Sequence, residues 1–335
     1  MLVNFILDSR KGGPHFVLQS VKKIIKKKSI DIYLDSNRKI FFFNLKRQSS
    51  FLYFFDILLN TIVILFKLKK YKYFFIYGIY NISPLLAGLF SKKNLYWFIL
   101  EKPNFFGKIM LLIFSKFNIK FVFIDKKLKK KFNFKKSSIF VPNIDIKFWK
   151  KSNIIKKKKY FLITTVGNIN KSKNHLNLVK FLSQSKLKFY LYIVGENLIN
   201  QKKYYYQLKK EIHKFNKKGK SKIFLKGRKN RKEIKTILNY TDLFILPSLT
   251  EGLSISLLEA MSMKCICLVS SDSNNSGVIN NSNGFIFNLN KESLNKSLHK
   301  IYNLSAKQKQ KISQNARLTV KNLIIANSFF KLNKN

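Results

Sequence analysis

Short apolar runs alternate with helical segments along almost the whole chain, and this alternation limits the possible fold more than any other feature. In the first half, the runs that predict strands are LVNFILD, IDIYL, KIFFFNL, YFFIYGIY, NLYWFIL, KFVFID and SIFVPN. Segments with helical periodicity separate several of them, near residues 50–67, 83–91, 104–116 and 126–132. Apolar strands that alternate with helices predict a parallel sheet covered on both faces.

The second half repeats this alternation, and glycine residues mark the ends of its strands more clearly. Its predicted strands are YFLITTVG, KFYLYIVG, KIFLKG, DLFILPS, CICLVSS and GFIFNL. Its predicted helices lie near residues 174–184, 203–216, 231–239, 255–263 and 291–303, and further helical residues follow 305. Three of the strands end in glycine, at Gly167, Gly195 and Gly227. Open α/β sheets bind ligands at the carboxyl ends of their strands, so we expect the functional loops there.

The length of the chain predicts two domains. Its 335 residues exceed the ~250–300 residues at which a single hydrophobic core usually stops growing. The lysine-rich segment 146–159 has no strand character and is the best boundary. We therefore predict an α/β protein of two doubly wound, Rossmann-like domains that face each other across a cleft. The predicted domains are residues 1–150 and 158–318, followed by a helical tail, 319–335.

A carboxylate stands among apolar residues in the stretch LPSLTEGLSISLLEAM, Leu246–Met261. Burying Glu259 without a partner would cost several kcal/mol or raise its pKa until it is neutral, so either it reaches water or something binds it. Glu251 should lie at the ligand end of the sheet, beside a helix N-terminus that favours phosphate. These parts suit a sugar nucleotide. The alternative is that Ser254 caps the helix and acidic residues merely favour its first turns.

A series of motifs in a fixed order covers the chain from Val141 to about Leu289. The motifs are VPNIDIKFW, TTVGNINKSKNHLNLVKFL, YIVGE, IFLKGRKNRKEIKTILNYTD, YTDLFILPSLTEGLSISLLEAMSMKCICLVSS and NSNGFIFN. This series resembles the retaining GT-B glycosyltransferases of family 4. Before Val141 the resemblance is thin, although GGPHFVLQS is similar to the glycine turn that faces the donor in that family.

The resemblance implies an activity. It implies that a sugar is moved from a nucleotide-diphosphate donor, such as a UDP- or GDP-sugar, to a glycan or lipid-linked acceptor with retention of configuration. The expected pathway is the synthesis of cell-surface polysaccharide or lipopolysaccharide. Fixed cations and helix N–H groups can stabilise the departing diphosphate, so no cofactor and no metal is implied.

The resemblance also implies the roles of individual residues. Glu259 would hold the ribose hydroxyls, Glu251 would lie near the donor sugar, and Lys173 would neutralise the diphosphate. The implied catalytic residues are therefore Glu251 and Lys173. The implied donor-binding residues are Gly12, Gly13, Gly167, Asn168, Lys173, Gly252, Leu253, Ser254 and Glu259.

The chain departs from the family pattern at three places. Asn168 stands where the family usually has arginine, so one diphosphate-binding cation is missing, for which Arg228 or Lys171 could substitute. Gly277 replaces a frequent glutamate, and the first-domain histidine has no clear match, Glu101 being nearest. These departures leave room for an altered donor preference, weak activity or a family member that has lost catalysis.

The four histidines divide into one candidate and three surface residues. His15, at the start of a predicted helix, could contact donor or acceptor; a solvated or packed histidine is the alternative. We predict that His175, His213 and His299 lie on the surface, because they occur in lysine-rich segments that predict helices.

The charge balance suggests a rival function. The 66 basic and 15 acidic residues give a formal net charge of +51, which favours nucleic acid or an anionic membrane as a partner. Lysine, asparagine, isoleucine and phenylalanine are all abundant and all use A/T-rich codons, so genome composition supplies much of this excess. The lysines are scattered and no nucleic-acid-binding motif is apparent. We therefore expect no specific nucleic-acid partner and keep nucleic-acid binding as the alternative.

Three segments bear on a membrane surface. In Lys126–Lys136, Leu128 and Phe132 stand four residues apart among lysines, which fits an anionic membrane surface or, alternatively, a solvated face. Lys22–Lys28 has the same two interpretations. The apolar run Phe51–Phe66 is shorter than the ~20 residues that a spanning helix needs. We predict that it forms a buried helix, with insertion into the membrane interface as the alternative.

Two further features favour the cytoplasm. No signal peptide is visible, because charged residues interrupt the N-terminus before an apolar region of adequate length. Cys265 and Cys267 alternate along a predicted strand and would point to opposite faces, which disfavours a disulfide. The predicted location is cytoplasmic, with peripheral association at the inner face of the membrane as an option.

Overall fold

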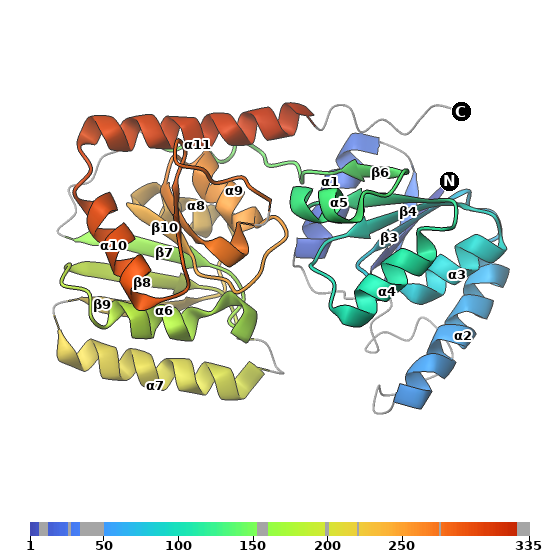
Figure 1. Cartoon of the computed structure of the whole chain (residues 1–335), viewed down its shortest axis with the longest axis horizontal. Helices are drawn as coiled ribbons and strands as arrows, with labels where there is room; N and C mark the ends of the chain where they lie inside the picture. Colours follow the sequence, from blue (N-terminus) through green and yellow to red (C-terminus); the bar gives the residue numbers. More distant parts are fainter. Residues whose placement is uncertain are drawn as a thin grey trace. The chain divides into compact units, whose positions relative to one another are not determined.

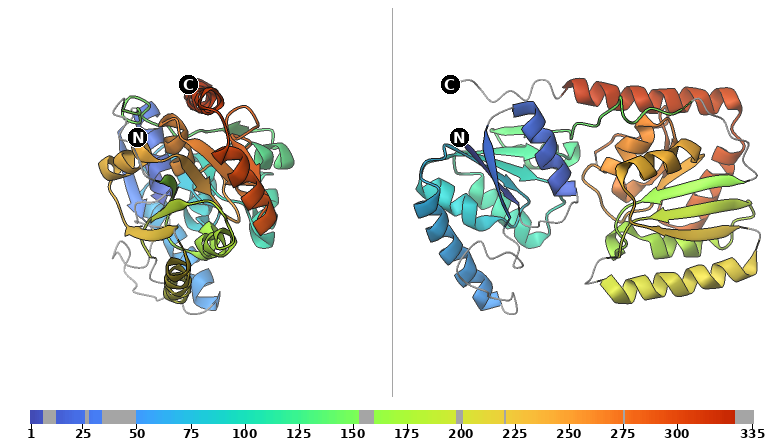
Figure 2. Two further views of the ribbon diagram at one scale, coloured as in Figure 1. Left: turned by 90° about the vertical axis from the view of Figure 1, so that its left-hand side faces the viewer. Right: turned by 180° about the vertical axis from the view of Figure 1, so that it is seen from behind.

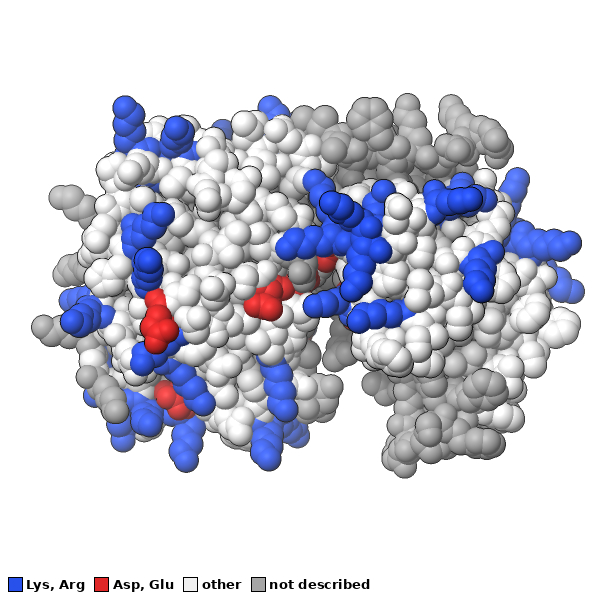
Figure 3. Space-filling model, viewed as in Figure 1, with Lys and Arg blue, Asp and Glu red and all other residues white. Residues whose placement is uncertain are grey.

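The computed structural model describes residues 1–6, 13–25, 28–33, 50–152, 160–197, 201–219, 221–274 and 276–326. The chain forms two compact units that divide between Asn143 and Ile144. Figure 1 shows that each unit contains a sheet flanked by helices, and Figure 3 shows that lysines are spread over the visible face of both. Among the described residues, none of the helices combines the length and hydropathy that crossing a membrane requires.

Unit 1 contains a six-stranded sheet in the order β2-β1-β3-β4-β5-β6, and every pair in it is parallel. The strands are β1 (Leu2–Ile6), β2 (Ser29–Tyr33), β3 (Tyr73–Tyr77), β4 (Asn94–Ile99), β5 (Ile119–Phe123) and β6 (Ser137–Ile139). The helices are α1 (Gly13–Ile25), α2 (Ser50–Lys67), α3 (Ile82–Phe90), α4 (Phe105–Phe114) and α5 (Lys126–Phe132). The predicted strand KIFFFNL lies outside the described residues.

The helices of unit 1 are divided between the two faces of its sheet. Apolar side chains of α2, α3, α4 and α5 pack into one core with the strands, and examples are Ile64, Leu85, Leu111 and Leu128. α1 lies on the opposite face, as the view from behind shows (Figure 2). Right-handed crossovers explain this division, because the chain first steps one way along the sheet and then returns in the other direction.

Unit 2 contains a second six-stranded parallel sheet, in the order β12-β11-β10-β7-β8-β9. The strands are β7 (Phe161–Val166), β8 (Phe189–Val194), β9 (Lys222–Gly227), β10 (Leu243–Leu246), β11 (Ile266–Ser270) and β12 (Phe285–Phe287). The longer helices are α6 (His175–Leu182), α7 (Lys202–Lys218), α8 (Arg231–Tyr240), α9 (Ile255–Ser262), α10 (Lys291–Tyr302) and α11 (Ala306–Ala326). Short 3-10 turns occur at η1 (Lys171–Lys173) and η3 (Ser271–Ser273). The two parallel sheets confirm the predicted α/β class.

The limits of the units differ from the predicted ranges. Unit 2 already begins at Ile144, because Ile144 and Trp149 are buried in it. Arg317 holds this segment: its guanidinium donates to the carbonyl of Trp149 at 2.7 Å, to that of Ile146 at 3.1 Å, and to that of Ser262 in α9. α11 also runs unbroken through 318/319, where the helical tail was predicted to start, because it is buried on both sides of that point.

Two predictions about membrane segments need correction. α5 covers the predicted residues, but Leu128 is buried and Phe132 packs against the core, so its apolar side is not available for insertion. α2 is a helix as predicted, but it is not a buried one. Its residues Phe55 and Phe66 are 50% and 69% exposed, because only one side of α2 contacts the core.

Candidate functional site

The loop after β7 packs tightly against the end of β8. The N–H of Gly167 donates to the carbonyl of Val194 at 2.9 Å. Gly195 has a φ of +155°, and a Cβ there would lie 2.0 Å from the carbonyl oxygen of Gly167, so only glycine fits. A Cβ on Gly167 would lie 3.2 Å from Cε of Lys173, which means that the lysine side chain extends across this glycine. Because Gly167 and Gly195 have no side chains, the backbones of the loops after β7 and β8 lie in contact and the Lys173 side chain can cross Gly167.

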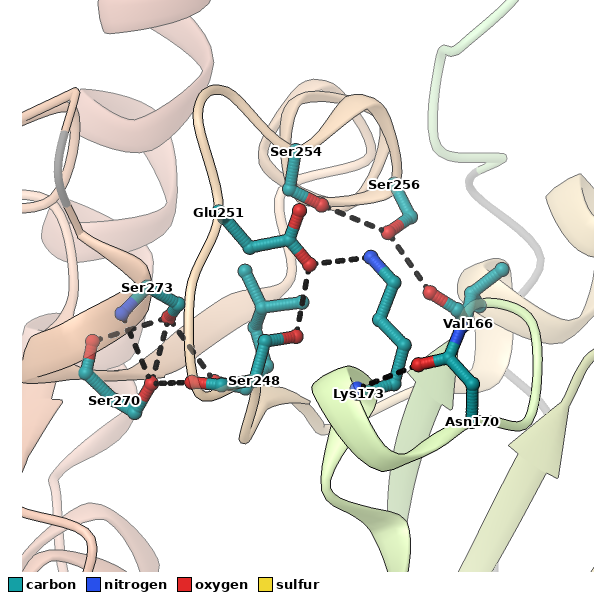
Figure 4. Close-up of polar contacts among 10 residues, drawn as sticks. Val166, Asn170, Lys173, Ser248, Glu251, Ser254, Ser256, Ser270 and Ser273 are labelled. Carbon is teal, nitrogen blue, oxygen red and sulfur yellow. Dashed lines mark hydrogen bonds and ion pairs between the residues drawn. The ribbon is translucent and has the colours of Figure 1, made fainter. Parts of the chain in front are cut away.

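Lys173 and Glu251 form an ion pair at the carboxyl ends of the strands (Figure 4). Asn170 fixes the lysine backbone by accepting from its N–H at 2.9 Å, and Lys173 Nζ contacts the Glu251 carboxylate. The hydroxyl of Ser248, which follows β10, donates to the same carboxylate oxygen at 2.8 Å. The two side chains are 23% and 15% exposed, so solvent screens this pair less than a surface pair. The loops after β7 and β10 therefore present one charged pair.

The opening turn of α9 faces the end of β7. Ser254 occupies the N-cap position, but its side chain makes no capping hydrogen bond. Its hydroxyl lies 3.1 Å from that of Ser256, which donates to the carbonyl of Val166 at 2.9 Å (Figure 4). The alternative that Ser254 merely caps the helix is therefore not the arrangement seen. Leu253 and Ser254 are buried, and Gly252 is half-buried between them and Glu251.

Glu259 lies one helical turn after Ser256, so both side chains stand on one face of α9. Glu259 is only 8% exposed. Among the residues that the structure describes, none forms a hydrogen bond or ion pair with its carboxyl group. Burial raises the pKa of Glu259 to about 8, and the nearby charge of Arg231 acts in the opposite direction. Glu259 therefore places a nearly buried carboxyl group, with no hydrogen-bond or ion-pair partner among the described residues, beside the opening turn of α9.

Arg231 was not predicted from the sequence. It begins α8, and its guanidinium lies 4.7 Å from the ring centroid of Phe148 and 5.6 Å from that of Trp149. Ser248, Ser256 and Asn170 were missed too. Asn170 carried a signal, since asparagine three residues before Lys173 is typical of a side chain that caps a turn.

The remaining predicted residues are not part of this network. Arg228 forms an ion pair with Glu196 at 3.3 Å, and both side chains are well exposed. Asn168 is exposed directly after Gly167. Lys171 is exposed in η1.

Four positions named from the sequence belong to unit 1. Gly12 lies outside the described residues, and Gly13 begins α1. His15 is half-buried in α1, and its Nδ1 has no hydrogen-bond partner among the described residues. Glu101 is exposed after β4.

The structure explains the glycine at position 277 and corrects the predicted exposure of His175. Gly277 has a φ of +65°, so a glutamate there would strain the backbone. His175 was predicted to lie on the surface, and this was wrong: it is 1% exposed at the start of α6. Burial, followed by the charge of Lys173, lowers the pKa of His175 to about 3, so this imidazole is neutral. His213 and His299 are exposed, as predicted.

Comparison with known proteins gives one family and one curated relative. The family described as "Glycosyl transferases group 1" matches residues 145–319, which is more than half of the chain. The curated relative is the UDP-Gal:alpha-D-GlcNAc-diphosphoundecaprenol alpha-1,3-galactosyltransferase of Escherichia coli, which is 34% identical over 158 residues. This alignment covers 45% of the chain and only 38% of the relative.

Solved structures share the fold over nearly the whole chain. The HepE protein of Anabaena, crystallised with UDP and glucose, has a TM-score of 0.79 at 12% identity and covers 97% of this chain and 96% of its own. A glycosyltransferase from Rickettsia africae has a TM-score of 0.77 at 19% identity, with the same coverage. At these identities the likeness shows the fold alone, and it agrees with the predicted two-domain GT-B architecture.

Proposed function

The chain belongs to the glycosyl transferases group 1, and from this premise we propose that it moves a sugar from a nucleotide-diphosphate donor to an acceptor hydroxyl. The observation that carries the proposal is the buried Glu259 carboxyl group, which has no protein partner among the described residues. A ribose presents two neighbouring hydroxyls, and a carboxylate can accept a hydrogen bond from each. Burial of such a group is costly unless a ligand supplies these bonds.

The charges near α9 suit the diphosphate. Lys173 provides a cation at the strand ends, and the N–H groups of the opening turn of α9 provide the positive end of a helix dipole. In the reaction, the bond between the sugar C1 and the diphosphate oxygen breaks, and a bond from C1 to the acceptor oxygen forms while the acceptor loses its proton. Lys173 would stabilise the negative charge on the departing diphosphate without reorganising. Glu251 would lie near the donor sugar and orient Lys173.

The finer parts of the proposal follow the family 4 resemblance. They are retention of configuration at C1 and a reaction that needs neither a metal nor a cofactor. Ser248 contributes by holding the Glu251 carboxylate at 2.8 Å. The exposed Asn168 offers the diphosphate no charge, so we expect Lys173 to supply most of the positive potential on the side of β7.

The relatives suggest the substrates. The Anabaena structure contains UDP and glucose, and the name of the Escherichia coli relative specifies UDP-galactose and a diphosphoundecaprenol acceptor. We propose a UDP-sugar as donor and a lipid-linked glycan as acceptor, in the synthesis of a cell-surface polysaccharide or lipopolysaccharide. Such a reaction would place the protein in the cytoplasm, at the inner face of the membrane.

A donor screen tests this function. The thermal unfolding of purified protein is measured with UDP, GDP and a panel of UDP- and GDP-sugars. In a separate assay, hydrolysis or transfer of each sugar is measured with and without EDTA. The proposal predicts stabilisation by UDP or GDP and EDTA-resistant turnover of at least one sugar nucleotide, which Glu259→Ala abolishes. Binding without turnover on any acceptor would instead indicate a family member that has lost catalysis. No stabilisation by any nucleotide would refute the proposal.

A further inference from the structure

Unit 1 exposes an unusual number of large apolar side chains on one side. Eleven of them on or next to α2, α3 and α4 are at least 39% exposed, and Phe105 reaches 78%. We call this surface the α2–α4 apolar face. Its residues are Phe55, Leu58, Ile62, Phe66, Phe90, Phe105, Phe106, Ile109, Leu112, Ile113 and Phe117.

These side chains follow the helical repeat, so they form continuous rows. On α2 the exposed residues are spaced three, four and four apart, which puts them on one side of the helix. The opposite sides of these helices fill the core, through Ile64 of α2 and Met110, Leu111 and Phe114 of α4. Both sides of α2 and α4 are therefore apolar. Apolar side chains that gather on the exposed sides of neighbouring helices are typical of a surface that binds a partner or a membrane.

The three helices lie next to each other on one face of the sheet (Figure 1). Lys93 Nζ, after α3, donates to the carbonyl of Lys69, after α2, at 2.7 Å, so the ends of these helices are joined. Phe66 and Phe90, 69% and 73% exposed, lie in the last turns of α2 and α3. Much of the surface over α3 and α4 carries no charge in Figure 3, with lysines at its borders.

Most of the charge in the segments that form this face is positive. Lys69 Nζ lies 5.4 Å from the ring centroid of Phe66, Lys108 is partly exposed within α4, and Lys116 is exposed in the turn after α4. Between positions 50 and 124 the sequence has only two acidic residues, Asp56 and Glu101, against many lysines. Apolar side chains bordered by lysines match the chemistry of an anionic bilayer, whose acyl region accepts the former and whose headgroups attract the latter. A second copy of the chain would bring lysines against lysines.

We propose that the α2–α4 apolar face inserts into the interface of an anionic lipid bilayer. This inference deepens the proposed membrane location by naming the contact surface, and it replaces the α5 segment, whose apolar residues pack inward. The inference rests on the proposed function in one respect: membrane binding would bring a lipid-linked acceptor to the enzyme. Binding to lipid itself needs no donor.

Vesicle sedimentation of the full chain tests the inference. Vesicles of phosphatidylcholine with 30% phosphatidylglycerol are compared with pure phosphatidylcholine, and a double variant, Phe105→Ser with Leu112→Ser, is compared with Tyr206→Ser. Tyr206 is 66% exposed on α7 of unit 2 and serves as the matched control. We expect wild type and control to bind the anionic vesicles equally, and the double variant to partition at least about tenfold less, because it loses two inserted apolar side chains.

Several results would overturn the inference. One is a wild-type protein that does not sediment with either vesicle, and another is a double variant that binds as well as wild type. A third is a concentration-dependent dimer, lost in the double variant and unaffected by vesicles, which would show a second copy as the occupant. UDP affinity measured without vesicles separates this proposal from the catalytic one, since the double variant should bind UDP as wild type does.

Discussion

The substitution Glu259→Gln should change how the stability of the protein depends on pH. Burial raises the pKa of this carboxyl group from 4.5 to about 8. The folded state therefore holds a proton that the unfolded state has already lost between these two pH values. Folded wild type loses stability as pH rises through this window, by ~1.4 kcal/mol per pH unit at most and on the order of 5 kcal/mol in total. Glutamine has nearly the same shape and no charge at any pH, so it lacks this loss.

The measurement is urea unfolding at a series of pH values from 5 to 8.5. Relative to wild type, Glu259→Gln should gain roughly 3 kcal/mol of unfolding free energy between pH 5 and pH 8. Glu211→Gln on α7 is the control, because Glu211 is partly exposed and has no part in the site. Its unfolding free energy should parallel that of wild type. A constant difference between Glu259→Gln and wild type across this range would refute the buried, unpaired state of Glu259.

Three further substitutions test the supports of the site. Gly195→Ala should destabilise the protein by about 3 kcal/mol in urea unfolding, because its Cβ would collide with the Gly167 carbonyl; Gly219→Ala, with open space around it, should be neutral within about 0.5 kcal/mol, and equal effects would contradict the close approach. Arg317→Met should lower the free energy of unfolding by about 3 kcal/mol, because it leaves backbone carbonyls unpaired. Arg228→Met, which breaks the exposed Arg228–Glu196 pair, should lower it by less than about 1 kcal/mol. Similar losses would argue against a structural role of the Arg317 hydrogen bonds. Lys173→Met should weaken UDP binding about tenfold but leave uridine binding unchanged, because uridine has no diphosphate. Lys180→Met, at an exposed position, is the control. An equal loss of uridine binding would place Lys173 away from the diphosphate.

Much of the fold could be predicted because both units follow one rule of packing. Strands buried on both faces are apolar runs, and the helices between them have their own period, so α5 and α8 begin at or within a residue of the predicted positions. No local pattern reports that residues 146–149 are held by Arg317, because Arg317 lies far away in the sequence and binds the carbonyls of Ile146 and Trp149.

Side-chain environments were harder to predict than elements. A long apolar run indicates a helix, but it does not show which side meets the core, so the exposed side of α2 was missed. His175 stands among polar residues, yet it is buried because α6 turns its first residue toward the core. The pairing of Lys173 with Glu251 joins residues 78 positions apart, and no local pattern reports such contacts. The motif series located these residues through resemblance alone.

The central claim is that the Glu259 carboxyl group binds the ribose of a nucleotide, and titration calorimetry with UDP tests it most directly. At pH 8.5, above the pKa of about 8 that burial gives this carboxyl group, hydrogen bonds to the charged acceptor contribute about 1.5–3 kcal/mol each, so Glu259→Gln should raise the Kd for UDP at least about tenfold. Glu211→Gln should bind UDP as wild type does. If Glu259→Gln and wild type bind UDP with the same Kd, this carboxyl group does not hold the nucleotide and the proposed donor site is wrong.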